Sequence, residues 1–142
     1  MPPQLQSMEI QAFSTGFVTT LGHAGLTLVI LLMGAVLYAM LTPHREIALI
    51  REGNTAAALS LGGVLVGLAL PLASSLGASV SPLEIALWGA ATVAFQLLVF
   101  RVIDLILHGL PQRIQEGEMS AAILLVGAKL ASALILAAAL AG

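Results

Sequence analysis

The stretch "REGNTAAALSLGGVLVGLALPLASS", residues 51–75, passes from a charged turn into a long apolar run. Arg51 and Glu52 carry its only charges, and none follows from Thr55 to its end. About 20 apolar residues, rising 1.5 Å each along a helix, cross the hydrocarbon core of a bilayer, which is about 30 Å thick. The stretch therefore predicts a helix that enters a membrane at the turn.

Three further apolar runs and the composition define the class of protein. The chain of 142 residues is 59% hydrophobic and 8% charged, with a mean hydropathy of +1.06, whereas soluble domains are about 25% charged. A soluble helical bundle would show polar outer faces at helical spacing, and these runs are apolar nearly all round. The sequence predicts an all-α integral membrane protein with an N-terminal segment, 1–16, and four spans, at 17–41, 55–78, 83–107 and 119–141.

Basic residues indicate how the spans are oriented. Arg45 and Arg51 lie between the first two spans, Arg113 lies between the last two, and the short segments on the other side contain no Lys or Arg. The positive-inside rule places both charged turns in the cytoplasm. Both termini are then expected outside. The first run lacks a basic flank and is longer than a signal-peptide core, so it is expected to be a retained span.

The two halves of the chain resemble each other at a constant shift. That shift pairs Ile50, Glu52 and Gly53 with Ile114, Glu116 and Gly117. A fixed Ile-x-Glu-Gly frame favours a tandem repeat. Each unit, 17–78 and 83–142, is a two-helix hairpin, so the chain returns to its starting side and both hairpins share one orientation. Their relating axis is then along the membrane normal, unlike that of inverted transporter repeats.

Each charged turn ends in a helix-start motif. Gly53 permits a sharp turn, Asn54 is a favoured N-cap, and Thr55 opens the span. In the second unit Gly117 and Glu118 take these places, and a carboxylate there suits the positive end of the helix dipole. The alternative is that the two helix starts form an anion or ligand site facing the cytoplasm.

Small residues follow each helix start. Gly63 and Gly67 form a G-x-x-x-G pattern, and the constant shift places Gly127 and Ala131 at the matching positions. Such spacing lets helix backbones approach closely in lipid. We expect the second and fourth spans to pack as a pair within the bundle or to form the seam of a homo-oligomer.

Four polar side chains inside the spans are candidate functional residues: Lys129, Gln96, Arg101 and Asp104. Arg101 and Asp104 are three apart and share one side of a helix, so they can pair. Lys129 lies near the middle of the last span, and Gln96 lies at a similar depth, whereas Asp104 is roughly 10 Å nearer the cytoplasm. Gln96 is therefore the expected partner of Lys129. A functional or assembly role for Lys129 and a locally satisfied structural lysine both stay open.

The sequence offers no chemistry of a recognisable enzyme. Cysteine is absent, and neither a zinc-protease H-E-x-x-H nor a G-x-S-x-G nucleophile pattern occurs. The net charge of −2, with no basic cluster, argues against a nucleic-acid partner. We expect no enzymatic activity, no cofactor and no metal site.

The stretch "LTPHREIALIREGNTAAALSLGGVLVGLALPLASS" and the second junction "EGEMSAAI" resemble the YjfL-like bacterial inner-membrane family, domain of unknown function 350. The likeness covers roughly residues 31–141 and implies a small multi-span protein of the bacterial inner (plasma) membrane, built from paired two-helix units. The family motif falls on Thr42, Pro43, His44, Gly53, Asn54 and Thr55. The sequence departs from the family at Glu118, where the second unit often has Asn, and the family motifs do not include Lys129.

Two classes of function fit these observations. The first is a structural or interaction component in the lipid bilayer that oligomerises or docks a membrane or cytoplasmic protein partner. An association of family relatives with envelope stress implies such a role. The alternative is an ion channel or small-solute transporter in which the polar residues of the spans line a path.

Overall fold

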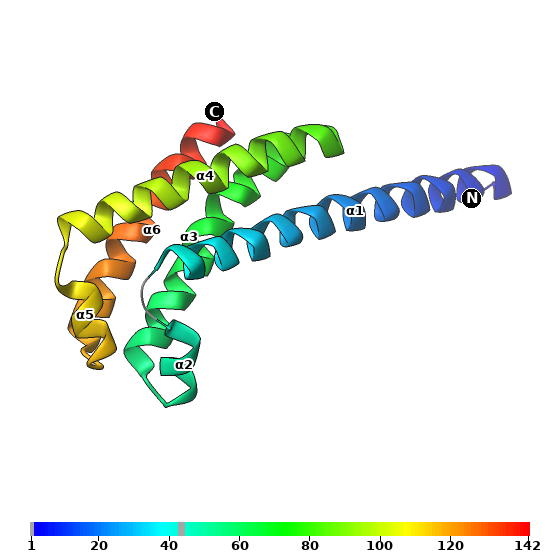
Figure 1. The fold of residues 1–142 in the computed structure, drawn as a ribbon. Helices are drawn as coiled ribbons and strands as arrows, with labels where there is room; N and C mark the ends of the chain where they lie inside the picture. Colours follow the sequence, from blue (N-terminus) through cyan, green and yellow to red (C-terminus); the bar gives the residue numbers. More distant parts are fainter. Residues whose placement is uncertain (1, 43–44) are drawn as a thin grey trace.

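The computed structural model describes residues 2–42 and 45–142, and its regular structure is helical (Figure 1). Four helices are long and apolar enough to cross a membrane: α1 (Pro3–Leu41), α3 (Thr55–Ala78), α4 (Pro82–Ile106) and α6 (Met119–Ala141). Two helices of six residues, α2 (Glu46–Arg51) and α5 (Leu110–Gln115), lie in the charged connections. The predicted all-α class with four candidate spans is confirmed. Pro43 and His44 of the family motif lie outside the described residues.

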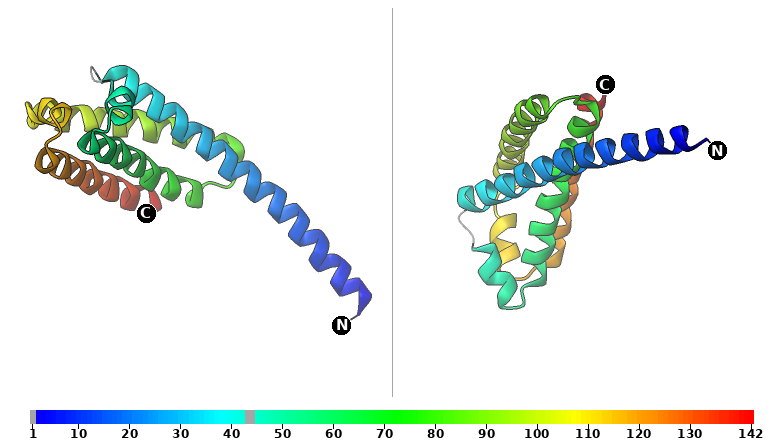
Figure 2. Two further views of the ribbon diagram at one scale, coloured as in Figure 1. Left: turned by 90° about the horizontal axis from the view of Figure 1, so that it is seen from below. Right: turned by 90° about the vertical axis from the view of Figure 1, so that its right-hand side faces the viewer.

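The helix bounds agree with the expected spans except at the start of α1. This helix begins at Pro3, well before the expected start at residue 17, and has 39 residues. At 1.5 Å per residue it is about 58 Å long, nearly twice the thickness of a hydrocarbon core. Its N-terminal half projects away from the other helices in every view (Figures 1 and 2). Short helices in the connections were not predicted.

The spans form a bundle, with the two charged connections at one end and the uncharged connection at the other. α2 and α5 lie at one end, and the α3–α4 connection lies at the other end with the C-terminus (Figures 1 and 2). The pair α3 and α6 shares the largest interface, and α1 packs on α3 and α4. This arrangement is the one expected for two hairpins of the same orientation. The relation of the halves as a sequence repeat stays a prediction.

Close packing of α3 comes from the first of the two small-residue pairs. A Cβ on Gly63 would lie 2.6 Å from a methyl group of Val126 on α6, and one on Gly67 would lie 2.7 Å from the Phe100 ring on α4. Gly127 and Ala131 are exposed, and a Cβ on Gly127 would meet open space. Gly63 therefore packs against Val126, the residue before Gly127, and the small-residue pair of α6 faces away from α3.

Candidate functional site

Lys129 of α6 carries a positive charge inside the bundle, and 1% of its surface is exposed. Its ammonium lies 3.0 Å from Oδ1 of Asp104 on α4 and donates a hydrogen bond of 3.1 Å to the Tyr38 hydroxyl on α1. It also lies 5.0 Å and 5.4 Å from the ring centroids of Tyr38 and Phe100, within the range of cation–π attraction. Lys129 therefore links three spans.

The partner of Lys129 differs from the expected Gln96. Helical side chains tilt toward the N-terminus of their helix, and the N-terminus of α6 lies at the α2/α5 end of the bundle. The flexible four-carbon stem thus carries the ammonium toward Asp104 and shortens the gap expected from helix rise alone. Gln96 is fully buried, and its Nε2 donates to Oγ of Ser132, 3.3 Å away.

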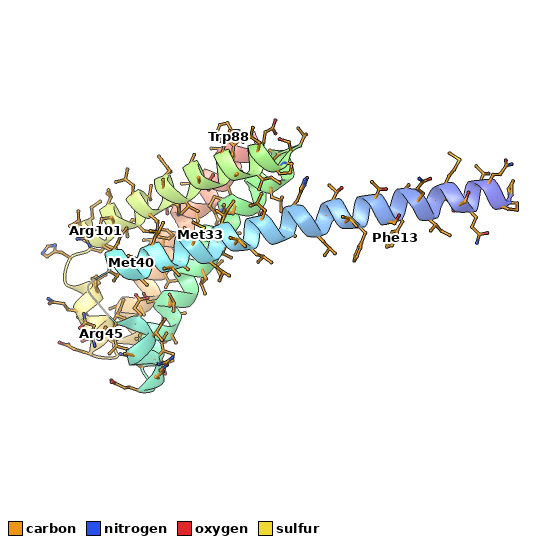
Figure 3. All side chains as sticks on the ribbon, turned by 45° about the vertical axis from the view of Figure 1, so that its right-hand side comes forward. Phe13, Met33, Met40, Arg45, Trp88 and Arg101 are labelled. Atoms are coloured by element: carbon orange, nitrogen blue, oxygen red, sulfur yellow. The ribbon has the colours of Figure 1, made fainter. Side chains whose placement is uncertain are left out.

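Arg101 also lies differently from expectation. Asp104, its expected partner, forms the ion pair with Lys129, and Arg101 is exposed near the α2/α5 end of the bundle (Figure 3). The Lys129–Asp104 contact lacks hydrogen-bond geometry, so Oδ1 of Asp104 has no hydrogen-bond partner among the described residues. This oxygen keeps its capacity to accept from a further donor.

A cavity of about 370 Å³ leads to these groups. It extends from exposed residues around α5, such as His108 and Gln112, to Tyr38 and Asp104 in the bundle. A second cavity, of about 200 Å³, shares the walls at Tyr38 and Asp104 and reaches Phe100. Arg101 lines both cavities. Asp104 and Tyr38, the two partners of Lys129, therefore border a space large enough for water or a small solute.

Glu46 on α2 belongs to the same group of side chains, although the sequence did not single it out. Only 7% of Glu46 is exposed, and its Oε1 accepts a hydrogen bond of 3.4 Å from the Tyr38 hydroxyl. Its Oε2 is buried without a hydrogen-bond partner among the described residues. Burial raises the pKa of Glu46, and the charge of Lys129 offsets only part of that rise. We call Lys129, Asp104, Tyr38 and Glu46 the Lys129 cluster.

One signal in the sequence could have pointed to the cluster. Tyr38 is the only tyrosine in the chain, and it lies in the last turn of α1, near the end of an apolar run. A hydroxyl at such a depth needs a polar partner. Within residues 2–42 and 45–142, no three His, Cys, Asp or Glu side chains gather closely enough to hold a metal ion.

The helix-start motif has a structural role in the first connection. The Asn54 side chain accepts a hydrogen bond of 3.0 Å from the Ala57 amide, and its Nδ2 donates to the carbonyls of Ile114 and Gln115. Asn54 thus caps α3 and binds the other connection. Gly53, just before it, has φ +89°, a conformation that glycine adopts without strain. Thr55, the first residue of α3, is exposed.

The second helix start is built differently. Glu118 occupies the N-cap position of α6, but its side chain makes no capping hydrogen bond and pairs with Arg113. Gly117 has φ +87°, like Gly53 in the first connection. The turn geometry therefore recurs in both connections, whereas of these two helix starts Asn54 has a side-chain cap and Glu118 has none.

The fold and site together define a multi-pass α-helical membrane protein with a buried ionisable cluster. The family described as Domain of Unknown Function (DUF350) matches residues 12–140, and the chain belongs to this family. The UPF0719 inner membrane protein YjfL of Escherichia coli (strain K12) is 34% identical over 114 residues, which cover 80% of this chain and 85% of that protein. YjfL of Escherichia coli O157:H7 gives the same values. No solved structure gives a significant match.

Proposed function

We propose that the protein conducts protons across the bacterial inner membrane, alone or with a small solute, through the Lys129 cluster. The observation that carries this proposal is the buried Lys129 ammonium, held between Asp104 and Tyr38 below a cavity of about 370 Å³. Ionisable side chains inside spans commonly mark ion pathways and proton relays. The inner-membrane location follows from the name of the YjfL relatives and from the four candidate spans.

A purely structural role accounts poorly for the ion pair. Removing two charges from water costs several kcal/mol for each ion, and well-packed apolar residues often hold a fold equally well. The α3–α6 interface already has the close contact between Gly63 and Val126, and Asn54 joins the two connections. These contacts involve none of the four residues of the Lys129 cluster. The cluster is therefore better explained by a function that needs charge in the bundle.

Glu46 is the group of the cluster suited to exchange a proton. The cluster holds one ammonium and two carboxyl groups, and Asp104 balances the charge of Lys129. Glu46 is then the additional acid, with a free oxygen and a pKa raised by burial. Hydrogen bonds lead from Lys129 through Tyr38 to Glu46. A change in the protonation of Glu46 therefore alters the field at the ion pair.

Polar groups continue from the cluster toward the other end of the bundle. Gln96, Thr92 and Ser75 are buried, and each has a side-chain oxygen without a partner among the described residues. Ser75 lines a cavity of about 300 Å³ together with Trp88, which lies at the end opposite to Arg101 (Figure 3). Buried unpaired polar atoms are natural sites for water. They supply the hydration that a proton path needs beyond the ion pair.

The direction of the cavity depends on the orientation of the chain. We propose that the α2/α5 end faces the cytoplasm, because Arg45, Arg51 and Arg113 are all in or beside these connections. Single cysteines at Ser7 and Ser79 test this orientation in right-side-out and inside-out membrane vesicles. Labelling by an impermeant reagent from the outside is expected at both positions, and labelling only from the cytoplasmic side contradicts it.

Reconstituted vesicles test the function itself. Purified protein in liposomes that contain a pH-sensitive dye is expected to acidify the lumen when a potassium diffusion potential draws cations inward. Glu46→Gln is expected to lower this proton flux at least tenfold, while Glu52→Gln, an exposed acid in the same connection, leaves it unchanged. The absence of flux at every potential and pH gradient, in protein shown to be folded, rules out the proposal.

Assembly is a second candidate function, favoured by the exposed small residues of α6. Gly127 and Ala131 lie at one helical turn from each other on an exposed face, which suits close approach of a helix from a second copy. A Gly127→Cys variant in native membranes is then expected to form disulfide dimers, and a Leu98→Cys variant at an exposed position on α4 is the comparison. Equal crosslinking at both positions argues against a specific seam.

A further inference from the structure

The outer surface of the bundle has an apolar groove beside the cavity at the Lys129 cluster, and the two share Thr42 and Glu46 in their walls. It has a volume of about 370 Å³ and lies between α1 and α3, with α2 at one end. Its apolar walls are the exposed or half-buried side chains Leu32, Ala35, Val36, Ala39, Leu61 and Leu65. These residues belong to spans, so the groove runs at the depth of the hydrocarbon core and faces lipid.

The groove has a cation at its α2 end. Arg45 lines it and is exposed, and Figure 3 shows Arg45 beside α2, at the end of the bundle that also holds Arg101. The ion pairs of the described residues involve Arg113 and Lys129, so the Arg45 guanidinium has no carboxylate partner there. Its depth is that of the membrane interface, because α1 ends at Leu41 and Arg45 follows within a few residues.

Glu46 is the acidic residue that also lines the groove. Its carboxyl accepts from the Tyr38 hydroxyl and is almost fully buried. Burial raises the pKa of this carboxyl, which reduces the negative charge that it presents to the groove. The charge at the mouth is therefore set by Arg45.

We propose that this groove is a binding site for an anionic phospholipid. One acyl chain lies between α1 and α3 along Val36, Ala39 and Leu65, and the headgroup phosphate binds the Arg45 guanidinium. The apolar walls at hydrocarbon depth match the acyl chain of such a lipid, and the cation at the interfacial end matches its anionic headgroup. A basic residue near an anionic headgroup contributes about 1 kcal/mol. The proposal does not depend on proton conduction.

Native mass spectrometry of the delipidated full-length protein tests this site. Phosphatidylglycerol is expected to bind about fivefold more tightly than phosphatidylcholine with the same acyl chains, the preference that about 1 kcal/mol gives. Arg45→Gln is expected to abolish the preference. Arg51→Gln is the matched control, because Arg51 is an exposed arginine at the other end of α2 that does not line the groove; it should keep the preference.

A second pair of variants tests the acyl-chain seat. Ala39→Phe, at an exposed position, fills the groove and is expected to weaken both lipids, whereas Ala94→Phe, at an exposed position on α4, leaves them unchanged. Equal affinities for the two lipids in the unmodified protein, or equal losses in Arg45→Gln and Arg51→Gln, overturn the proposal. So does an Ala39→Phe variant that loses a dimer but keeps its lipid affinities, because the groove then holds a second copy.

Discussion

Lys129 and Asp104 form an ion pair of 3.0 Å between α6 and α4, although their places along the two helices differ by roughly 10 Å of helix rise. The long lysine stem closes this difference by extending toward the N-terminus of α6. The pair is nearly inaccessible on the lysine side and borders a cavity on the aspartate side. Solvent in the cavity therefore reaches the Asp104 carboxylate more readily than the Lys129 ammonium.

Neutralising one member of the pair should destabilise the protein more than neutralising both. Lys129→Met leaves the Asp104 carboxylate without its counter-charge, and breaking a buried pair in this way costs about 3–5 kcal/mol. Lys129→Met with Asp104→Asn removes both charges and should recover most of that loss. Denaturant unfolding in detergent micelles measures these free energies of unfolding. Arg101→Met, at an exposed position, is the control, and additive effects of the two single changes contradict the pairing.

The stability of the protein should depend on pH through Glu46. The folded-state pKa of this acid is raised above its ordinary value of 4.5, so the neutral form is favoured by folding. The resulting stabilisation is complete below pH 4.5 and is lost as the pH rises through the folded-state pKa. The melting temperature of the unmodified protein should therefore fall, relative to that of Glu46→Gln, as the pH is raised from 4.5. A difference that stays constant over this range contradicts a buried acid at this position.

The two small-residue pairs should respond oppositely to the same substitution. Gly63→Ala places a methyl group 2.6 Å from Val126, and such overpacking typically costs 1–3 kcal/mol. Gly127→Ala adds a methyl group in open space and improves helix propensity by up to about 1 kcal/mol. Unfolding in detergent should show a loss for the first variant and no loss for the second. Equal effects would place the α3–α6 contact elsewhere.

The two helix starts should differ in their contribution to stability. Asn54→Ala removes the cap of α3 and both bonds to the second connection, and loss of the cap alone costs about 1 kcal/mol. Asn54→Asp keeps an acceptor for the Ala57 amide but no longer donates to the second connection. Its free energy of unfolding should therefore fall between those of the unmodified protein and Asn54→Ala. Glu118→Ala breaks an exposed ion pair, whose expected cost is below about 1 kcal/mol. A loss at Glu118 as large as that at Asn54 contradicts this difference.

The positions of the spans could be predicted from the sequence because each depends on a local property, the hydropathy of its own residues. A run of apolar residues between charged turns determines α3 and α6, and their bounds agree with the expected ranges. The start of α1 was not accessible in this way. Its first turns contain polar residues such as Gln4 and Glu9, which hydropathy assigns to the aqueous side whether or not they are helical.

The site was less accessible because its contacts depend on side-chain direction and on short helices in the connections. Depth along a helix favours Gln96 as the partner of Lys129, whereas the tilt of the lysine stem selects Asp104. Glu46 reaches Tyr38 because α2 turns it inward. Equivalent positions in the two halves also differ in their surroundings, as Gly63 is buried and Gly127 is exposed. A pattern of residues does not reveal such differences.

The claim that the Lys129 cluster carries the proton path is tested most directly by the flux of a folded protein without its central charges. Proteoliposomes with the Lys129→Met, Asp104→Asn double variant, shown by its unfolding to keep the fold, should conduct protons at least tenfold more slowly than those with the unmodified protein. The Glu52→Gln protein, changed at an exposed acid that lines neither cavity, supplies the comparison. Proton flux in the double variant equal to that of the unmodified protein would contradict the account.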